Sequence, residues 1–234
     1  MSDPRVTALP VRDCGEELVD LRGCRALLID GRRRDADGTF AWVRQDLRRR
    51  LEHAARLLPD GIRILAVEGY RPRELQLQYF QEYCSQLRAL HPDWAEPQVL
   101  TAASRYVAPP EIAPHTAGAA IDLTLCAEDG KELDLGSTLN ASPEESNGAC
   151  YTDAPDLPPA ARSNRAVLIQ ALRGVGLTNY PTEWWHWSVG DRYWAAVTGA
   201  VAAHYGPCSP PILLRRSVGP DQPMATEDLL AGDL

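Results

Sequence analysis

The sequence predicts an α+β domain in which a small, mainly antiparallel sheet is flanked by helices. Apolar residues recur at steps of three and four over residues 39–58 and 73–90, which predicts two long amphipathic helices. Short apolar or alternating runs between turn-forming residues predict the strands of the sheet. With 234 residues, 44% of them hydrophobic, the chain can bury one large core, so we expect a single domain.

The first half of the chain is expected to alternate between strands and helices. Thr39 can cap the first long helix, and the turn residues Pro59, Asp60 and Gly61 stop it. The expected elements, in order, are a strand over residues 24–30, a helix over 39–58, a strand over 62–67 and a helix over 73–90.

The second half contains a longer irregular segment. Ile121, Leu123 and Leu125 alternate with small or polar residues, which is typical of a half-buried strand and turns Asp122 away from the core. The expected elements are a Pro-containing region over residues 91–114, a strand over 118–125, an irregular connection over 128–159, a helix over 160–173, a strand within 177–189 and a helix over 191–204. We place the domain over residues 1–206 and a Pro-containing acidic tail over 207–234.

Composition and charge exclude several classes of function. The net charge of −8 argues against a nucleic-acid partner, and no run approaches the roughly 20 apolar residues of a membrane span. The six cysteines are scattered, without the close C-x-x-C spacing of zinc or redox sites. Reduced cysteines and the lack of a visible export signal lead us to expect a cytoplasmic protein; a secreted protein with disulfides is the alternative.

Two segments carry residue types that suit a metal. In the first, His115 lies in a turn and Asp122 on the strand that follows, and the small residues between them let both side chains reach one ion. In the second, Glu183-Trp184-Trp185-His186, the imidazole can complete a three-ligand site that keeps a fourth position open. Glu183 can then act as a base, provided that the chain bends before His186.

A third segment, Glu68-Gly69-Tyr70-Arg71-Pro72, lies at the end of a predicted strand. An arginine there can donate a planar fork of hydrogen bonds to a carbonyl oxygen that becomes negatively charged. Pairing of Arg71 with Glu68 or Glu74 is the purely structural alternative. Glu68 itself is expected to support the loop rather than to react.

Together, EGYRP, HTAGAAIDLTL and EWWH resemble the motif set of the VanX-type D-alanyl-D-alanine dipeptidases. The similarity extends over residues 21–194, with order and spacing preserved. This zinc family is similar in fold to the D,D-carboxypeptidases and the hedgehog signalling domain. The resemblance implies a zinc site on one sheet face, with ligands and catalytic residues as follows: zinc ligands His115, Asp122 and His186, general base and acid Glu183, and oxyanion stabilisation by Arg71.

We therefore expect a zinc-dependent hydrolase of a dipeptide or small amide substrate. One alternative is a D,D- or L,D-carboxypeptidase on cell-wall peptides: a lid formed by residues 128–159 would favour dipeptides, and an open groove would favour polymers. A biosynthetic amidase or peptide-modifying enzyme is another alternative. A zinc-stabilised binding domain without hydrolysis is the fourth reading, although both Glu183 and Arg71 are present.

The sequence departs from the family pattern where the substrate ends would bind. In the dipeptidases, a Ser two residues before the first zinc ligand contacts the substrate carboxylate, and an Asp contacts its ammonium. The matching positions here are Ala113 and Asn140, which we expect to contact substrate together with Tyr70. Because neither replacement supplies the same bond, we predict weak cleavage of free D-Ala-D-Ala and a preference for an acylated, neutral or differently placed amino end.

Overall fold

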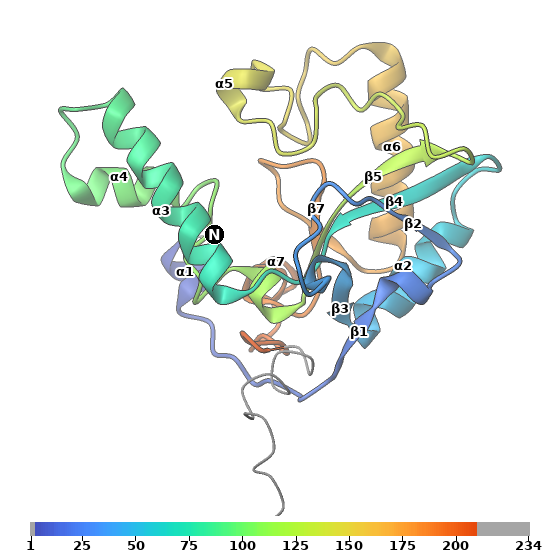
Figure 1. The fold of residues 1–234 in the computed structure, drawn as a ribbon, viewed down its shortest axis with the longest axis horizontal. Coiled ribbons are helices and arrows are strands. Elements are labelled where there is room, and N and C mark those ends of the chain that lie inside the picture. The colour runs from blue at the N-terminus through green and yellow to red at the C-terminus, as the bar shows by residue number, and fades with distance from the viewer. Residues whose placement is uncertain (1–2, 210–234) are drawn as a thin grey trace, which may run out of the picture.

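The main sheet of the computed structural model, which describes residues 3–209, has five strands in the order β2-β4-β5-β7-β6 (Figure 1). Only the β2–β4 pair is parallel in this sheet, and a separate two-stranded antiparallel sheet joins β1 and β3. The strands are β1 Leu18–Asp20, β2 Leu27–Ile29, β3 Trp42–Arg44, β4 Ile62–Glu68, β5 Ala120–Ala127, β6 Thr178–Asn179 and β7 His186–Ser188. The predicted α+β class is confirmed. Most of the predicted tail, from residue 210 onward, lies outside the described residues.

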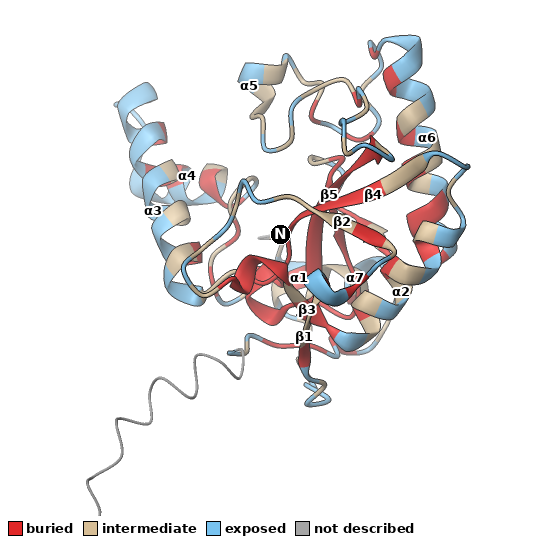
Figure 2. Cartoon of the chain, turned by 45° about the vertical axis from the view of Figure 1, so that its right-hand side comes forward, coloured by how far each residue is buried: buried red, intermediate tan, exposed pale blue. Residues whose placement is uncertain are grey.

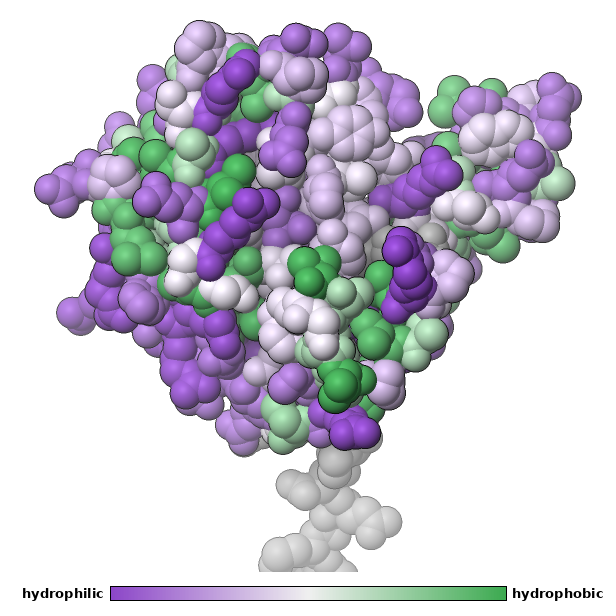
Figure 3. Space-filling view, turned by 180° about the vertical axis from the view of Figure 1, so that it is seen from behind, coloured by the Kyte–Doolittle hydropathy of each residue, from purple (hydrophilic) through white to green (hydrophobic). Residues whose placement is uncertain are grey.

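Helices surround the main sheet, and one pair protrudes from the body. The α-helices are α1 Pro4–Thr7, α2 Gln45–Arg56, α3 Arg73–Leu90, α4 Glu96–Ala103, α5 Pro143–Ser146, α6 Pro159–Gly174 and α7 Arg192–Thr198. The 3-10 helices are η1 Leu21–Gly23, η2 Thr39–Ala41 and η3 Pro114–Ala117. The hairpin of α3 and α4 extends away from the sheet and forms a separate lobe (Figures 1 and 3), while α5 lies across from it (Figure 1).

The hydrophobic core packs on one face of the central strand β5. Ile121, Leu123 and Leu125 are buried in the main hydrophobic cluster together with residues of α2 and α6, such as Leu51 and Leu172. These buried residues lie in the middle of the molecule, whereas the outer faces of the helices are exposed (Figure 2). Because strand side chains alternate, the even-numbered residues of β5 point to the other face, as predicted for Asp122.

The predicted helix over residues 39–58 is wrong in its first part. Residues 39–41 form η2 and residues 42–44 form β3, so that α2 begins at Gln45. The Asp35 carboxylate accepts hydrogen bonds from the backbone N–H groups of Thr39 and Phe40, at 2.9 and 2.8 Å, and Val43 pairs with Val19 of β1. A capped turn, followed by a strand that pairs with the distant β1, thus replaces the first part of the helix that the local apolar periodicity predicted.

Three further elements differ from expectation. The region 91–114 contains the short helix α4, and the aromatic strand expected within 177–189 is divided into β6 and β7 by a turn. Helix α7 ends at Thr198 rather than at residue 204, because Gly199 adopts a left-handed conformation, with φ of 74°, and ends the helix. The segment 128–159 is irregular as predicted, apart from the single turn of α5.

The surface opposite the view of Figure 1 carries apolar side chains in several groups that hydrophilic side chains separate (Figure 3). Among the described residues, no helix combines the length and apolar character that crossing a membrane requires.

A single arginine of α6 ties the irregular segment to the body. Arg165 is 2% exposed, and its guanidinium donates to four carbonyl oxygens of that segment. The acceptors are Leu135 at 2.7 Å, Tyr151 at 2.5 Å, Thr152 at 3.1 Å and Ala149. One buried cation therefore supplies hydrogen bonds to four backbone carbonyl groups of a segment with little regular structure.

We predict that Arg165→Met lowers the free energy of unfolding by about 2–4 kcal/mol, because four carbonyl groups, two of them buried with the guanidinium, lose a charged donor. Urea denaturation measures the change. Arg173→Met, at an exposed position of the same helix, is the matched control and should stay within about 0.5 kcal/mol of the parent protein. Equal stability of the Arg165 and Arg173 variants would contradict this account.

Candidate metal centre

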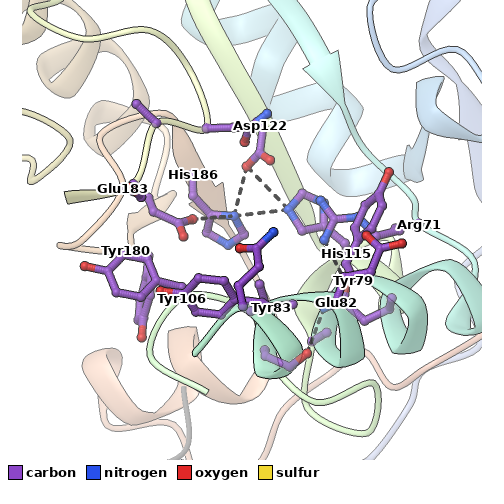
Figure 4. Close-up of a pocket in the computed structure, with 18 of the residues that line it drawn as sticks. Arg71, Tyr79, Glu82, Tyr83, Tyr106, His115, Asp122, Tyr180, Glu183 and His186 are labelled. Carbon is purple, nitrogen blue, oxygen red and sulfur yellow. Dashed lines mark hydrogen bonds and ion pairs between the residues drawn. The ribbon is translucent and has the colours of Figure 1, made fainter. Parts of the chain in front are cut away.

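Three predicted ligands converge on the sheet face opposite the core. His115 lies on η3, Asp122 on β5, and His186 begins β7, directly opposite Asp122 in the antiparallel pair. The Nδ1 atom of His186 is 2.9 Å from Oδ1 of Asp122 and 3.1 Å from Nε2 of His115, and the latter atom is 3.4 Å from the same carboxylate oxygen (Figure 4). All three residues are buried. The structure thus brings the whole predicted ligand set together.

The geometry of the three ligating atoms fits zinc. Tetrahedral zinc, with bonds of about 2.0–2.2 Å, holds its ligand atoms about 3.3 Å apart, which is close to the observed separations. Nδ1 of His115 is 2.6 Å from the carbonyl oxygen of Gly69, which can only accept, so this nitrogen carries the proton. Nε2 of His115 therefore presents a lone pair to the other two ligands, as a metal requires.

A glycine turn connects the first two ligands. Gly118 follows η3 in a left-handed conformation, with φ of 62°, and a Cβ atom there would lie 2.2 Å from Cδ2 of Leu18. Its amide donates to the carbonyl of His115 at 3.1 Å, which reverses the chain toward β5. Arg44, which the sequence analysis did not select, holds the same turn by donating from Nε to the carbonyl of Ala117 at 2.8 Å. No motif around Arg44 indicates this role.

Glu183 lies in the turn between β6 and β7, so the predicted bend before His186 is present. Its amide donates to the carbonyl of Tyr180 at 3.0 Å, and the amide of His186 donates to the carbonyl of Glu183 at 3.1 Å. The Glu183 carboxylate is 3.9 Å from Nδ1 of His186. Burial raises the pKa of Glu183 to about 7, against the opposing effect of His186. Near neutral pH this carboxyl group can both accept and release a proton.

Arg71 is held by an ion pair and also lines the cavity beside the ligands. Its Nε and Nη2 donate to the two Glu68 oxygens at 2.7 and 2.6 Å, and Nη1 donates to Gln76 at 2.8 Å. Burial disfavours the Glu68 carboxylate, but Arg71 keeps the pKa of Glu68 below its usual value. Of the five N–H donors of an arginine, these bonds within the described chain use three, and two remain for a ligand.

A cavity of about 630 Å³ opens onto the three ligands. The predicted residues Arg71, Glu183, Ala113 and Asn140 all line it. Tyr70 is not among the lining residues, because its hydroxyl donates to the carbonyl of Cys208 at 2.7 Å. Several lining aromatic residues were not selected from the sequence, where nothing distinguished them from core residues: Tyr79, Tyr83, Tyr106 and Tyr180.

Comparisons with known proteins identify the family. The profile of peptidase family M15, described as D-ala-D-ala dipeptidase, matches residues 42–204. The chain belongs to this family. A D-alanyl-D-alanine dipeptidase of Synechocystis sp. is 27% identical over 221 residues, covering 80% of this chain and 87% of the relative. A D-alanyl-D-alanine dipeptidase of Escherichia coli is 32% identical over 130 residues, 56% of each chain.

Among solved structures, the LdcB LD-carboxypeptidase aligns with 80% of this M15 chain and 73% of its own, at 17% identity and a TM-score of 0.44. Membership of the family, together with the His115, Asp122 and His186 cluster, makes the protein a metallopeptidase with zinc as its cofactor.

We predict one zinc ion per chain, because two imidazoles and one carboxylate form a three-ligand site with an open fourth position. Elemental analysis after gel filtration should find about one zinc in the parent protein and almost none in the His115→Ala/His186→Ala double variant. His53→Ala, on the exposed side of α2, serves as the control and should keep its zinc. Full zinc retention in the double variant would assign the metal to other residues.

Proposed function

We propose that this M15 peptidase hydrolyses the amide bond of a small peptide, with Glu183 as general base and acid and Arg71 as the donor to the developing oxyanion. The observation that carries the proposal is the position of the largely buried Glu183 carboxyl, which lies 3.9 Å from a ligating nitrogen of His186 and whose pKa is raised by burial to about 7. A base works best when its pKa lies near the working pH. A structural carboxylate would instead be paired, as Glu68 is with Arg71.

The chain's own residues would divide the reaction between them. Zinc, when bound, supplies positive charge that acidifies water and polarises a carbonyl group. Glu183 takes a proton from the attacking water and delivers it to the leaving amine as the C–N bond breaks. Arg71 directs its two remaining N–H donors at the carbonyl oxygen as charge develops there, and Glu68 and Gln76 hold the guanidinium in place.

Replacement of Glu183 tests its role directly. We expect Glu183→Gln to keep the zinc but to lower kcat by about 10²–10⁴-fold, because the amide cannot accept the proton. Steady-state kinetics on the best substrate, with zinc content measured on the same sample, provides the test. Glu128→Gln, at an exposed position, is the matched control. Activity of the Glu183 variant within a few-fold of the parent would exclude Glu183 as the base.

We propose that this protein recognises the two ends of its substrate differently from the dipeptidases that its motifs resemble. Ala113 has no hydroxyl for a substrate carboxylate, and the Asn140 amide is uncharged, yet both line the cavity. Asn140 adopts a left-handed conformation, with φ of 67°, which Asp also tolerates. We therefore assign this protein a peptide substrate whose amino end is not a free ammonium held at residue 140.

The relatives named D-alanyl-D-alanine dipeptidase provide the comparison for this assignment. We predict that kcat/KM for free D-Ala-D-Ala stays below about 10⁴ M⁻¹s⁻¹ and that N-acylated forms are cleaved faster. Asn140→Asp should raise kcat/KM for the free dipeptide about tenfold or more, since a carboxylate restores a charge-assisted bond to the ammonium. Asn140→Ser, which adds no charge, is the control. Efficient cleavage of free D-Ala-D-Ala by the parent protein would refute the altered recognition.

A cytoplasmic location and a role in cell-wall peptide turnover complete the proposal. All six cysteines lie within the described residues and are unpaired, which supports a reducing compartment. We retain residues 1–206 as one catalytic domain. The first residues beyond it pack on this domain, since the amide of Cys208 donates to the carbonyl of Thr116 at 3.0 Å.

A further inference from the structure

The cavity that holds the metal ligands continues along one face of α3. The α3 residues that line it recur every three or four positions and include Gln76, Tyr79, Tyr83, Leu87 and Leu90. At 1.5 Å per residue, the wall from Gln76 to Leu90 is about 21 Å long. A fully extended dipeptide spans only about 7 Å. The cavity is therefore much longer than a dipeptide substrate needs.

The inner and outer ends of this wall can be distinguished by their contacts. The Gln76 side chain accepts a hydrogen bond from Arg71, which lies close to Asp122 and lines the cavity with the metal ligands, so this end is the catalytic one. Leu90 and the adjoining His91 mark the outer end. Between them, Tyr83 and Tyr106 pack edge to face, with ring centroids 5.9 Å apart, near Glu183 and His186 in Figure 4.

The opposite wall is formed by residues 140–145, which include the start of α5. A capping box fixes this wall: the amide of Glu145 donates to the Ser142 hydroxyl at 3.1 Å, and the Ser142 amide donates to the Glu145 carboxylate at 2.9 Å. Beyond the two walls, the hydroxyl of Tyr106, which follows α4 and lines the cavity, lies 3.2 Å from that of Tyr151, which follows α5. A chain lying between the walls would thus meet preformed side chains on both sides.

The charges on the two walls differ between the inner and outer parts. The two lining arginines, Arg33 and Arg71, both stack on Tyr79, at 5.8 and 5.1 Å, and so belong to the inner part. The other wall residues with full charges are acidic and come from both sides: Glu82 on α3, and Glu144 and Glu145 on the opposite wall. The carboxylate of Glu144 lies close enough to Tyr83 and Tyr106 to help burial raise the pKa of both hydroxyls. The outer part of the cavity therefore favours cations.

We propose that the outer part of the cavity, between α3 and residues 140–145, binds the amino-side portion of a peptide longer than a dipeptide and prefers a positively charged group there. The orientation follows from charge, because the acidic walls attract amino groups and repel the carboxyl-terminal side of a peptide. This inference rests on the proposed hydrolysis of small peptides and extends it to the residues that precede the cleaved bond.

The test compares three substrates that share a D-Ala-D-Ala carboxyl end. They are the free dipeptide, a pentapeptide with Lys at its third position and the matched pentapeptide with Glu there. The parent protein should cleave the Lys peptide about tenfold more efficiently than the Glu peptide and at least that much more efficiently than the free dipeptide. Glu82→Gln/Glu144→Gln, with one change on each wall, should reduce the Lys-to-Glu ratio toward one, mainly through KM. Glu128→Gln is the control that should preserve the ratio.

Binding to zinc-loaded Glu183→Gln protein, measured by calorimetry, separates this inference from the proposed reaction. Tighter binding of the Lys pentapeptide than of the Glu pentapeptide or the dipeptide supports the outer subsite, whatever the turnover. Equal binding of all three, or equal cleavage of both pentapeptides, would overturn it while leaving the hydrolytic function intact. Failure of the parent protein to cleave any of the three, combined with selective binding, would instead overturn the proposed hydrolysis of these peptides and retain the subsite.

Discussion

The alternation of side chains along β5 is the constraint on which the rest of the site depends. Ile121, Leu123 and Leu125 are buried against α2 and α6, which forces Asp122 onto the opposite face, across from His186 of β7. A register shift of one residue would move three core side chains to the face that carries the metal ligands and would place the carboxylate among the apolar groups of the core. The packing that stabilises the core therefore also fixes the position of Asp122, and no further contact is needed to orient this metal ligand.

Buried charges around this strand are compensated in different ways, and the difference indicates function. Two imidazoles lower the pKa of Asp122 against the effect of burial, and Arg71 does the same for Glu68. Glu183 is largely buried without a partner of comparable strength, so its pKa is raised to about 7. A carboxyl group that costs free energy to ionise contributes little to stability, but its proton affinity suits a group that must accept and return a proton.

The metal ligands and the walls of the substrate cavity lie on different parts of the fold. The ligands lie on or beside strands of the main sheet, whose hydrogen bonds and core packing hold them within a few ångströms of one another. The walls come from the protruding α3 and from a segment with little regular structure, which Arg165 ties to the body. Such peripheral walls can change without disturbing the metal site.

The sequence by itself predicted the three residues that the structure gathers into one cluster, the strand that carries Asp122, the helix over 73–90 and the α+β class, because each depends on local spacing and periodicity. Only the tertiary structure decided that residues 39–44 leave the helical pattern: β3 pairs with β1, more than twenty residues away, and this pairing outweighs local preference. The same holds for the site. Its ligands belong to contiguous motifs, whereas the tyrosines of the cavity, the anchor Arg44 and the charge of the outer walls arise where distant segments meet. Local sequence patterns do not predict contacts between distant segments, since such contacts depend on how the whole chain packs.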